Sequence, residues 1–314
     1  MTSAKKRVLA GAALLLGALA SHAYPLDGYA DTGIRRLEEL RLANEGVIRD
    51  VKQPAGALLS TAEVDLRLAG KTWDLPEPDP AFSQQMRGLL GGTMDGYAMA
   101  VLDLADPERP RYAELRGDYK QNVGSVGKIA VVLALFQALA DHYPDDIEAR
   151  KRVLKNTTVT ADTFSVRDGH TVRFYNPATK ALVRRPIQVG DQASLFEFVD
   201  WMLSPSSNSA AGMVMREAML LRQYGKSYPP SEAEIKRFFS ETPKAELTRL
   251  FEATFYEPVT RNGLSLERLR QGSFFTAGGK SMVPGAGDSY GTAPELLRYL
   301  LRMEQGRLVD AWSS

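Results

Sequence analysis

The sequence contains no cysteine, so disulfides, cysteine nucleophiles and thiolate metal sites are all excluded. It has only three histidines, His22, His142 and His170, and the zinc-binding patterns His-Glu-x-x-His and Cys-x-x-Cys do not occur. A metal-dependent hydrolase is therefore not indicated, and we expect no cofactor. An excess of charge of one sign is also lacking, because the net charge is +1 over 314 residues. No overall field draws such a chain to nucleic acid or to an anionic membrane, and we expect neither as a partner.

The N-terminus has the pattern of an export signal. The basic run Lys5-Lys6-Arg7 is followed by an apolar stretch over residues 8–20 and by Ser21-His22-Ala23, a small-x-small cleavage pattern. The apolar stretch is short for a membrane-spanning helix. We predict that residues 1–23 are removed, and that the mature protein is periplasmic or secreted and keeps no membrane span. An uncleaved N-terminal anchor is the alternative.

The rest of the chain predicts an α+β protein with more helix than strand. Residues 24–79 have the pattern of a helical extension, and residues 80–314 form the main domain. In that domain we expect helices over 80–90 (with Asp79 as N-cap), 129–140, 194–203, 209–223, from 231 and over 294–307. We expect strands over 97–102 and 111–116, loops with short strands over 151–190, and a loop over 278–291. The order favours an antiparallel sheet flanked by helices, with an inserted all-helical subdomain at about 125–284.

A Ser-x-x-Lys pattern, Ser125-Val126-Gly127-Lys128, opens the most apolar of these helices. Residues three apart lie on one face of a helix, and the serine would sit at its positive N-terminal end. Burial of the lysine beside the apolar helix would depress its pKa and leave a neutral amine as a base. A serine hydroxyl can be activated in this way without histidine. The same pattern at Ser3–Lys6 lies inside the export signal and carries no such context.

A second polar group, Ser206-Ser207-Asn208, lies in the break between two predicted helices. The Ser206 hydroxyl can relay a proton to a leaving nitrogen, and the Asn208 amide can hold the lysine and a substrate amide. Serine and asparagine also favour helix starts, so an ordinary helix cap is the alternative interpretation.

Together these patterns resemble class A serine β-lactamases and D-alanyl-D-alanine carboxypeptidases, whose signature set is Ser-x-x-Lys, Ser-x-Asn and Lys-Thr/Ser-Gly. The flanking segments 188–195, 209–211, 290–294 and 306–308 are similar to those of the family, and the resemblance covers roughly residues 80–314. It implies a β-lactamase/transpeptidase-like fold and acyl transfer to Ser125. In that reaction Lys128 is the base, Ser206 the proton relay and Asn208 a substrate ligand. The implied substrate is a β-lactam or a peptidoglycan stem peptide; the oligomeric state stays open.

Two departures from the family pattern affect the expected activity. No Glu-x-x-x-Asn precedes Thr292, and the nearest carboxylate in a turn-like setting is Glu257, the candidate base for deacylation. Lys280-Ser281 is followed by Met282 instead of glycine, and we interpret it as a coincidence in a loop. A slow or non-catalytic relative that binds penicillin or peptidoglycan is therefore the alternative function.

The predicted sheet has one hairpin, which is a marginal base for a core of this size. We therefore expect the chain to be incomplete at its C-terminus, with further strands beyond Ser314 that carry Lys-Thr/Ser-Gly. If no such strands follow, Lys280 and Ser281 become the candidates for the third motif.

Overall fold

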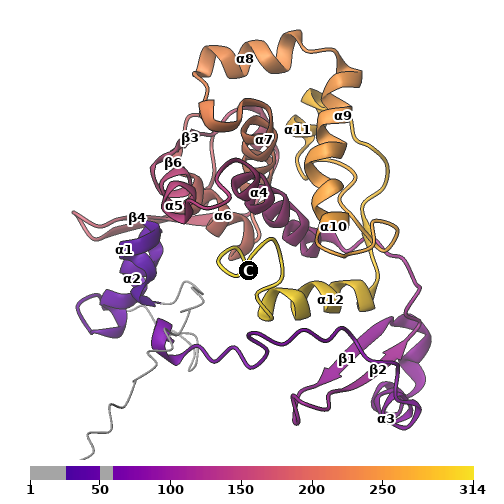
Figure 1. The fold of residues 1–314 in the computed structure, drawn as a ribbon. Helices are drawn as coiled ribbons and strands as arrows, with labels where there is room; N and C mark the ends of the chain where they lie inside the picture. The colour runs from indigo at the N-terminus through magenta and orange to yellow at the C-terminus, as the bar shows by residue number, and fades with distance from the viewer. Residues whose placement is uncertain (1–25, 50–58) are drawn as a thin grey trace, which may run out of the picture.

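The computed structural model describes residues 26–49 and 59–314 (Figure 1). The predicted export signal lies outside the described residues. The described chain is a mixed α/β protein in which helices predominate and the strands form short antiparallel pairs.

The helices are bounded as follows: α1 Tyr29–Thr32, α2 Arg35–Asn44, α3 Pro80–Leu90, α4 Lys128–His142, α5 Ile147–Asn156, α6 Leu195–Leu203, α7 Asn208–Tyr224, α8 Glu232–Glu241, α9 Lys244–Phe255, α10 Glu257–Arg261, α11 Ala277–Met282 and α12 Ala293–Glu304. Short 3-10 turns include η4 (Gly124–Gly127) and η5 (Thr163–Ser165).

The strands pair as β1 (Met99–Asp103) with β2 (Arg111–Leu115), β3 (Thr158–Thr160) with β6 (Gln192–Ser194), β4 (Thr171–Asn176) with β5 (Ala181–Pro186), and β7 (Leu269–Arg270) with β8 (Tyr290–Gly291). Each pair is antiparallel, and the described strands join into no larger sheet.

Helices α4 and α7 pack against each other at the centre, and both contact α6 and α9 (Figure 1). Every residue of α7 from Ser209 to Leu221 is buried. A helix buried on all sides has to be enclosed by other elements, and this explains the apolar runs of both sequences. Among the described residues, η4 and α4 together (Gly124–His142) are long and apolar enough to cross a membrane. This segment is mostly buried inside the protein, and a buried core helix has the same length and composition.

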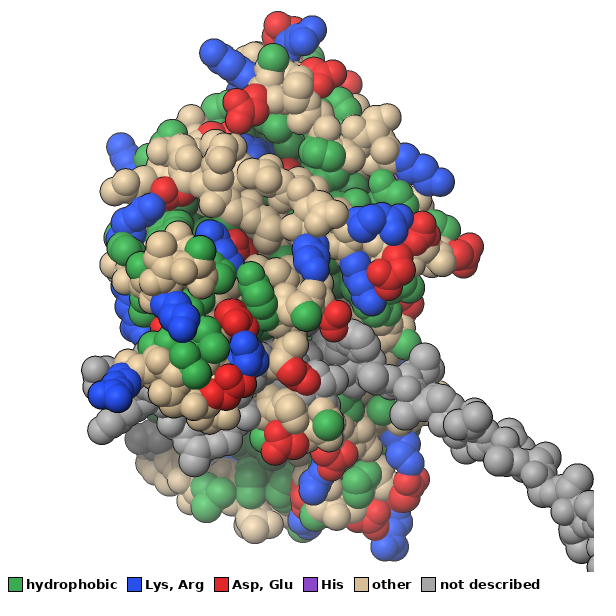
Figure 2. All heavy atoms as spheres, turned by 90° about the vertical axis from the view of Figure 1, so that its left-hand side faces the viewer, with side chains coloured by type: hydrophobic (Ala, Val, Ile, Leu, Met, Phe, Trp, Pro, Cys, Tyr) green, Lys and Arg blue, Asp and Glu red, His purple; other side chains and the backbone are tan. Residues whose placement is uncertain are grey.

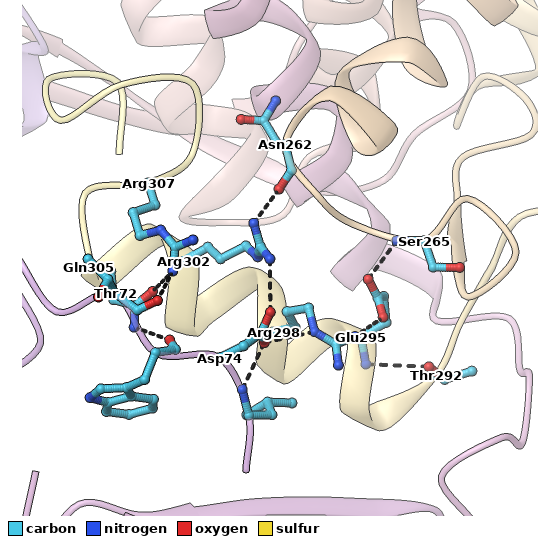
Figure 3. Close-up of polar contacts among 12 residues, drawn as sticks. Thr72, Asp74, Asn262, Ser265, Thr292, Glu295, Arg298, Arg302, Gln305 and Arg307 are labelled. Carbon is cyan, nitrogen blue, oxygen red and sulfur yellow. Dashed lines mark hydrogen bonds and ion pairs between the residues drawn. The ribbon is translucent and has the colours of Figure 1, made fainter. Parts of the chain in front are cut away.

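The β1–β2 hairpin and α3 lie beside α12, at the far side from α8 (Figure 1). A network of polar contacts joins residues 72–74, which precede α3 in the chain, to α12 and the residues after it (Figure 3). The Asp74 carboxylate pairs with Arg298 at 3.0 Å and with Arg302 at 2.9 Å. The side chains of Gln305 and Arg307 donate to backbone carbonyls of residues 73 and 72, at 2.7 and 2.8 Å. Residues 72–74 therefore follow α12 in extended form, and the predicted helical extension is helical mainly in α2.

Two expectations about the middle of the chain are wrong. The subdomain at 125–284 is not all-helical, because it contains the β3–β6 and β4–β5 pairs. The predicted loop over 278–291 begins inside α11, where the Thr276 hydroxyl caps the helix by accepting from the Gly279 N–H at 3.1 Å. A cap of this kind allows a short glycine-containing helix that the apolar pattern does not predict.

Figure 2 shows the face that carries α2, α5 and the β4–β5 hairpin. Over the described part of this face, acidic and basic side chains are interspersed and do not gather into a patch of one sign. Two ion pairs, Arg35–Glu197 at 2.7 Å and Arg36–Asp200 at 2.6 Å, attach α2 to α6.

Candidate active site

The first half of the site is the turn η4 and the first residue of α4. Gly124 has φ +53°, a left-handed conformation that glycine adopts without strain, and its N–H donates to the Asn122 side chain at 2.9 Å. This sharp entry exposes Ser125 to solvent while Lys128 is buried. The Lys128 ammonium nitrogen lies 3.1 Å from the Ser125 hydroxyl oxygen, as the Ser-x-x-Lys spacing predicts.

The second half is the connection between α6 and α7. From Lys128 Nζ it is 3.1 Å to the Ser206 hydroxyl, 2.5 Å to the Ser206 carbonyl oxygen and 2.8 Å to Asn208 Oδ1. The structure therefore brings Ser125, Lys128, Ser206 and Asn208 together, from segments separated by 78 to 80 residues.

Lys128 is buried, with 2% of its surface exposed, and its ammonium lies 5.1 Å from the centre of the Phe275 ring. Burial lowers the pKa of Lys128 from 10.5 to about 8, although the negative charge of Asp168 opposes this by raising it. A lysine with this pKa is partly neutral near pH 8 and can accept a proton from a neighbouring hydroxyl.

Sequence reasoning missed Asp168, which lies directly behind the Ser206–Asn208 connection. Its carboxylate accepts hydrogen bonds from the Ser207 hydroxyl and from the Ser209 N–H, both at 2.9 Å. Burial opposes its ionisation, but the hydrogen bonds from Ser209, His170 and Ser207 outweigh burial and lower the pKa of Asp168 to about 2. No local pattern marks this residue as part of the site, because Ser207 and Ser209 follow 39 and 41 residues later.

The Ser125 backbone N–H and the Gln271 side chain lie near the Ser125 hydroxyl. The Ser125 N–H has no hydrogen-bond acceptor within the described chain, so it is available to an incoming oxygen atom. Gln271 lies against the turn, since a Cβ at position 127 would be 2.7 Å from its Oε1. Its amide nitrogen donates to the Ser273 carbonyl at 2.5 Å, and this bond fixes the side chain. A neutral carboxamide therefore lies against this turn.

The structure does not bring Glu257 to the other four residues. Glu257 pairs with Arg222 near the C-terminal end of α7, whereas Asn208 begins that helix. Fourteen residues at 1.5 Å each separate these positions by about 21 Å along the axis. Glu257 is therefore not placed to activate water at Ser125.

Lys280 and Ser281 lie on α11 and make no contact with the four residues in the described structure. The Lys280 side chain is exposed, and the Ser281 hydroxyl donates to the Gly278 carbonyl at 2.7 Å within its own helix. Lys280 and Ser281 therefore lie in a short helix and not in the predicted loop.

No protein-family model matches this chain, and no curated protein matches its sequence. Among residues 26–49 and 59–314 there is also no group of three or more histidine or acidic side chains that could hold a metal ion. The function therefore has to be inferred from the geometry of the site.

Proposed function

We propose that this protein is an exported serine hydrolase that forms an acyl-enzyme with a β-lactam or a D-alanyl-D-alanine peptide. The observation that carries the proposal is the position of Lys128 Nζ, 3.1 Å from the hydroxyl oxygens of both Ser125 and Ser206. A buried amine between two hydroxyls can take a proton from one and return it through the other. The similarity of the motifs to serine β-lactamases and carboxypeptidases supports this assignment, including a β-lactamase/transpeptidase-like fold.

The proposed reaction begins when neutral Lys128 takes the proton of the Ser125 hydroxyl. The Ser125 oxygen then attacks the amide carbonyl of the substrate, and the negative charge that develops on the carbonyl oxygen is stabilised by the free Ser125 N–H. The proton passes from Lys128 through the Ser206 hydroxyl to the leaving nitrogen, and the carbon–nitrogen bond breaks. The products of this half-reaction are an ester on Ser125 and a free amine. Asn208 holds the substrate amide.

Hydrolysis of this ester needs a base for the attacking water, and one observation favours a slow second step. A side chain against the Ser125 turn is the neutral amide of Gln271, and Glu257 pairs with Arg222, which lies about 21 Å from Asn208 along the axis of α7. Asp168, the carboxylate behind the connection, already accepts hydrogen bonds from Ser207, Ser209 and His170. A slow relative that binds penicillin or peptidoglycan and keeps a long-lived acyl-enzyme is therefore the second candidate function.

The test is covalent labelling of the full-length protein by a fluorescent penicillin, with acylation and deacylation measured separately. Ser125→Ala should abolish labelling without unfolding the protein, because it removes one exposed hydroxyl. Lys128→Arg keeps a cation but removes the base, so acylation should fall about 100-fold or more. Ser227→Ala, at an exposed serine on another turn, is the matched control and should label normally. Undiminished labelling of Ser125→Ala, or normal acylation by Lys128→Arg, would overturn the mechanism.

A further inference from the structure

We propose that Asp168 is a positioning residue of this site: it clamps both neighbours of Asn208 and so holds Ser206 in the conformation that faces Lys128. The inference rests on the proposed function for its catalytic consequence only. The clamp itself is a statement about geometry and charge that can be tested without any substrate.

The contacts of Asp168 lie on either side of Asn208. One carboxylate oxygen accepts from the Ser207 hydroxyl and from the Ser209 N–H, at 2.9 Å each. The other oxygen accepts from the His170 N–H at 3.1 Å and contacts the His170 ring at 2.5 Å. The Asp168 side chain is 2% exposed, and Ser207 and Ser209 are fully buried or nearly so. The carboxylate is therefore a fixed part of the interior.

The same connection has a second attachment to this part of the chain. The Ser209 hydroxyl donates to the Ser165 carbonyl at 2.5 Å, and the Ser207 hydroxyl accepts from the Ala210 N–H at 3.1 Å as the N-cap of α7. Residues 165 and 168 are therefore bonded to the start of α7 and restrain the position of Asn208.

Ser206 needs such support because its backbone is unfavourable. Its φ is +64°, in the left-handed region, which is strained for a residue with a Cβ. A conformation of this kind persists only where the surroundings determine it. In this conformation both the carbonyl oxygen and the hydroxyl of Ser206 reach Lys128 Nζ, at 2.5 and 3.1 Å. Loss of the Asp168 contacts would allow Ser206 to relax and both oxygens to move.

The negative charge of Asp168 has a second effect, on Lys128. Among the groups that can ionise, His170 on the same segment contacts Asp168, and Lys128 on α4 experiences its charge, while the contacts at the start of α7 are the uncharged Ser207 hydroxyl and Ser209 N–H. The charge raises the pKa of Lys128 against the lowering effect of burial. Its removal should therefore move the ionisation of Lys128 to lower pH, an effect that simple loosening of the fold would not produce.

The first experiment compares wild type with Asp168→Asn, which keeps the shape but loses the charge and replaces an accepting oxygen by an NH2 group. Asp118→Asn is the control, since Asp118 is 88% exposed and pairs with Arg268. The titration of Lys128 is followed by NMR of 13C-labelled lysine, assigned with Lys128→Met. We expect the midpoint of Lys128 to fall in Asp168→Asn and to stay unchanged in Asp118→Asn. An unmoved midpoint in a folded Asp168→Asn would overturn the inference, whether or not wild type reacts with penicillin.

The second readout is the rate of acylation by the fluorescent penicillin above the midpoint of Lys128. Displacement of a catalytic group by about 1 Å can cost on the order of 100-fold, so we expect Asp168→Asn to lose at least tenfold. If Asp168→Asn does not fold, Ser207→Ala replaces it, because it removes one arm of the clamp and keeps the carboxylate; it should acylate several-fold more slowly. An acylation rate equal to that of wild type in the folded variant would overturn the positioning role. Failure of wild type itself to label would instead refute the proposed function and leave the titration as the test.

Discussion

Replacement of Lys128 by methionine should change how the stability of the protein depends on pH. Lys128 is buried with 2% exposure, and burial lowers its pKa from 10.5 to about 8. In the unfolded chain the lysine ionises with its ordinary pKa, so between these two values the unfolded state binds more protons than the folded state. The free energy of unfolding should therefore rise with pH across this interval.

The size of the effect follows from the shift. One unit of pKa corresponds to about 1.4 kcal/mol, so a shift from 10.5 to about 8 corresponds to roughly 3 kcal/mol. The sign is fixed by the direction of the shift. Above the ordinary pKa both states hold a neutral amine and there is no penalty. The penalty grows as the pH falls, and below the folded pKa of about 8 it is present in full. Methionine has a similar length and no charge, so it removes this dependence.

The assay is urea unfolding of wild type and Lys128→Met at about pH 7 and again near pH 10.5. The difference in unfolding free energy between the two proteins should shift in favour of wild type by roughly 3 kcal/mol over this range. Tyrosines and other lysines titrate in both proteins and cancel in the difference. Lys226→Met, at an exposed lysine, is the control and should show no such shift. A constant difference between wild type and Lys128→Met would refute the idea that the amine is held desolvated.

Two further predictions concern packing and capping. Gly278→Ala should destabilise the protein by about 1–3 kcal/mol in urea unfolding, since its new Cβ would lie 1.8 Å from the Thr163 carbonyl oxygen. The control is Gly88→Ala, whose Cβ would have no atom within 4 Å and which should be neutral or stabilising. Equal effects of the two substitutions would contradict the packing of α11 on η5. Asp79→Ala should cost about 1 kcal/mol, because the Asp79 carboxylate caps α3 by accepting from the Phe82 N–H at 3.0 Å, and an unchanged urea midpoint would show that the cap contributes nothing.

Helices with local start signals could be predicted from the sequence to within a residue or two. Asp79 caps α3, which begins and ends where the pattern predicts, and Ser194 caps α6, which begins one residue after the predicted start. The start of α7 was predicted at Ser209 and is found at Asn208, with Ser207 as the cap. These successes have one cause: a cap and an apolar period are set by residues within a few positions of each other.

Features that depend on distant pairs were not predictable in the same way. Strand β3 is completed by β6, where Thr158 lies opposite Ser194, and nothing near either segment identifies the partner. Asp168 is another such case, because only the tertiary structure places its carboxylate against Ser207. Ser125 and Lys128 could be predicted from the sequence, since the two residues in contact are three positions apart. Ser206 and Asn208 were predicted from the motif resemblance, and spacing alone left them as an ordinary helix cap.

The meeting of these distant segments has a physical consequence for the chemistry. Lys128 is the first residue of α4 and Asn208 the first residue of α7, and their side chains bond at 2.8 Å, so the N-termini of the two central helices converge on the site. At their other ends both helices contact α10, through Arg261–Asp141 and Arg222–Glu257. Each N-terminus carries a partial positive charge, which disfavours the Lys128 ammonium and adds to the effect of burial. The same field favours negative charge at Ser125, as an alkoxide or as the oxyanion of a tetrahedral intermediate. The packing of α4 against α7 therefore supports both halves of the proposed reaction, a neutral amine as base and an anionic centre at the serine.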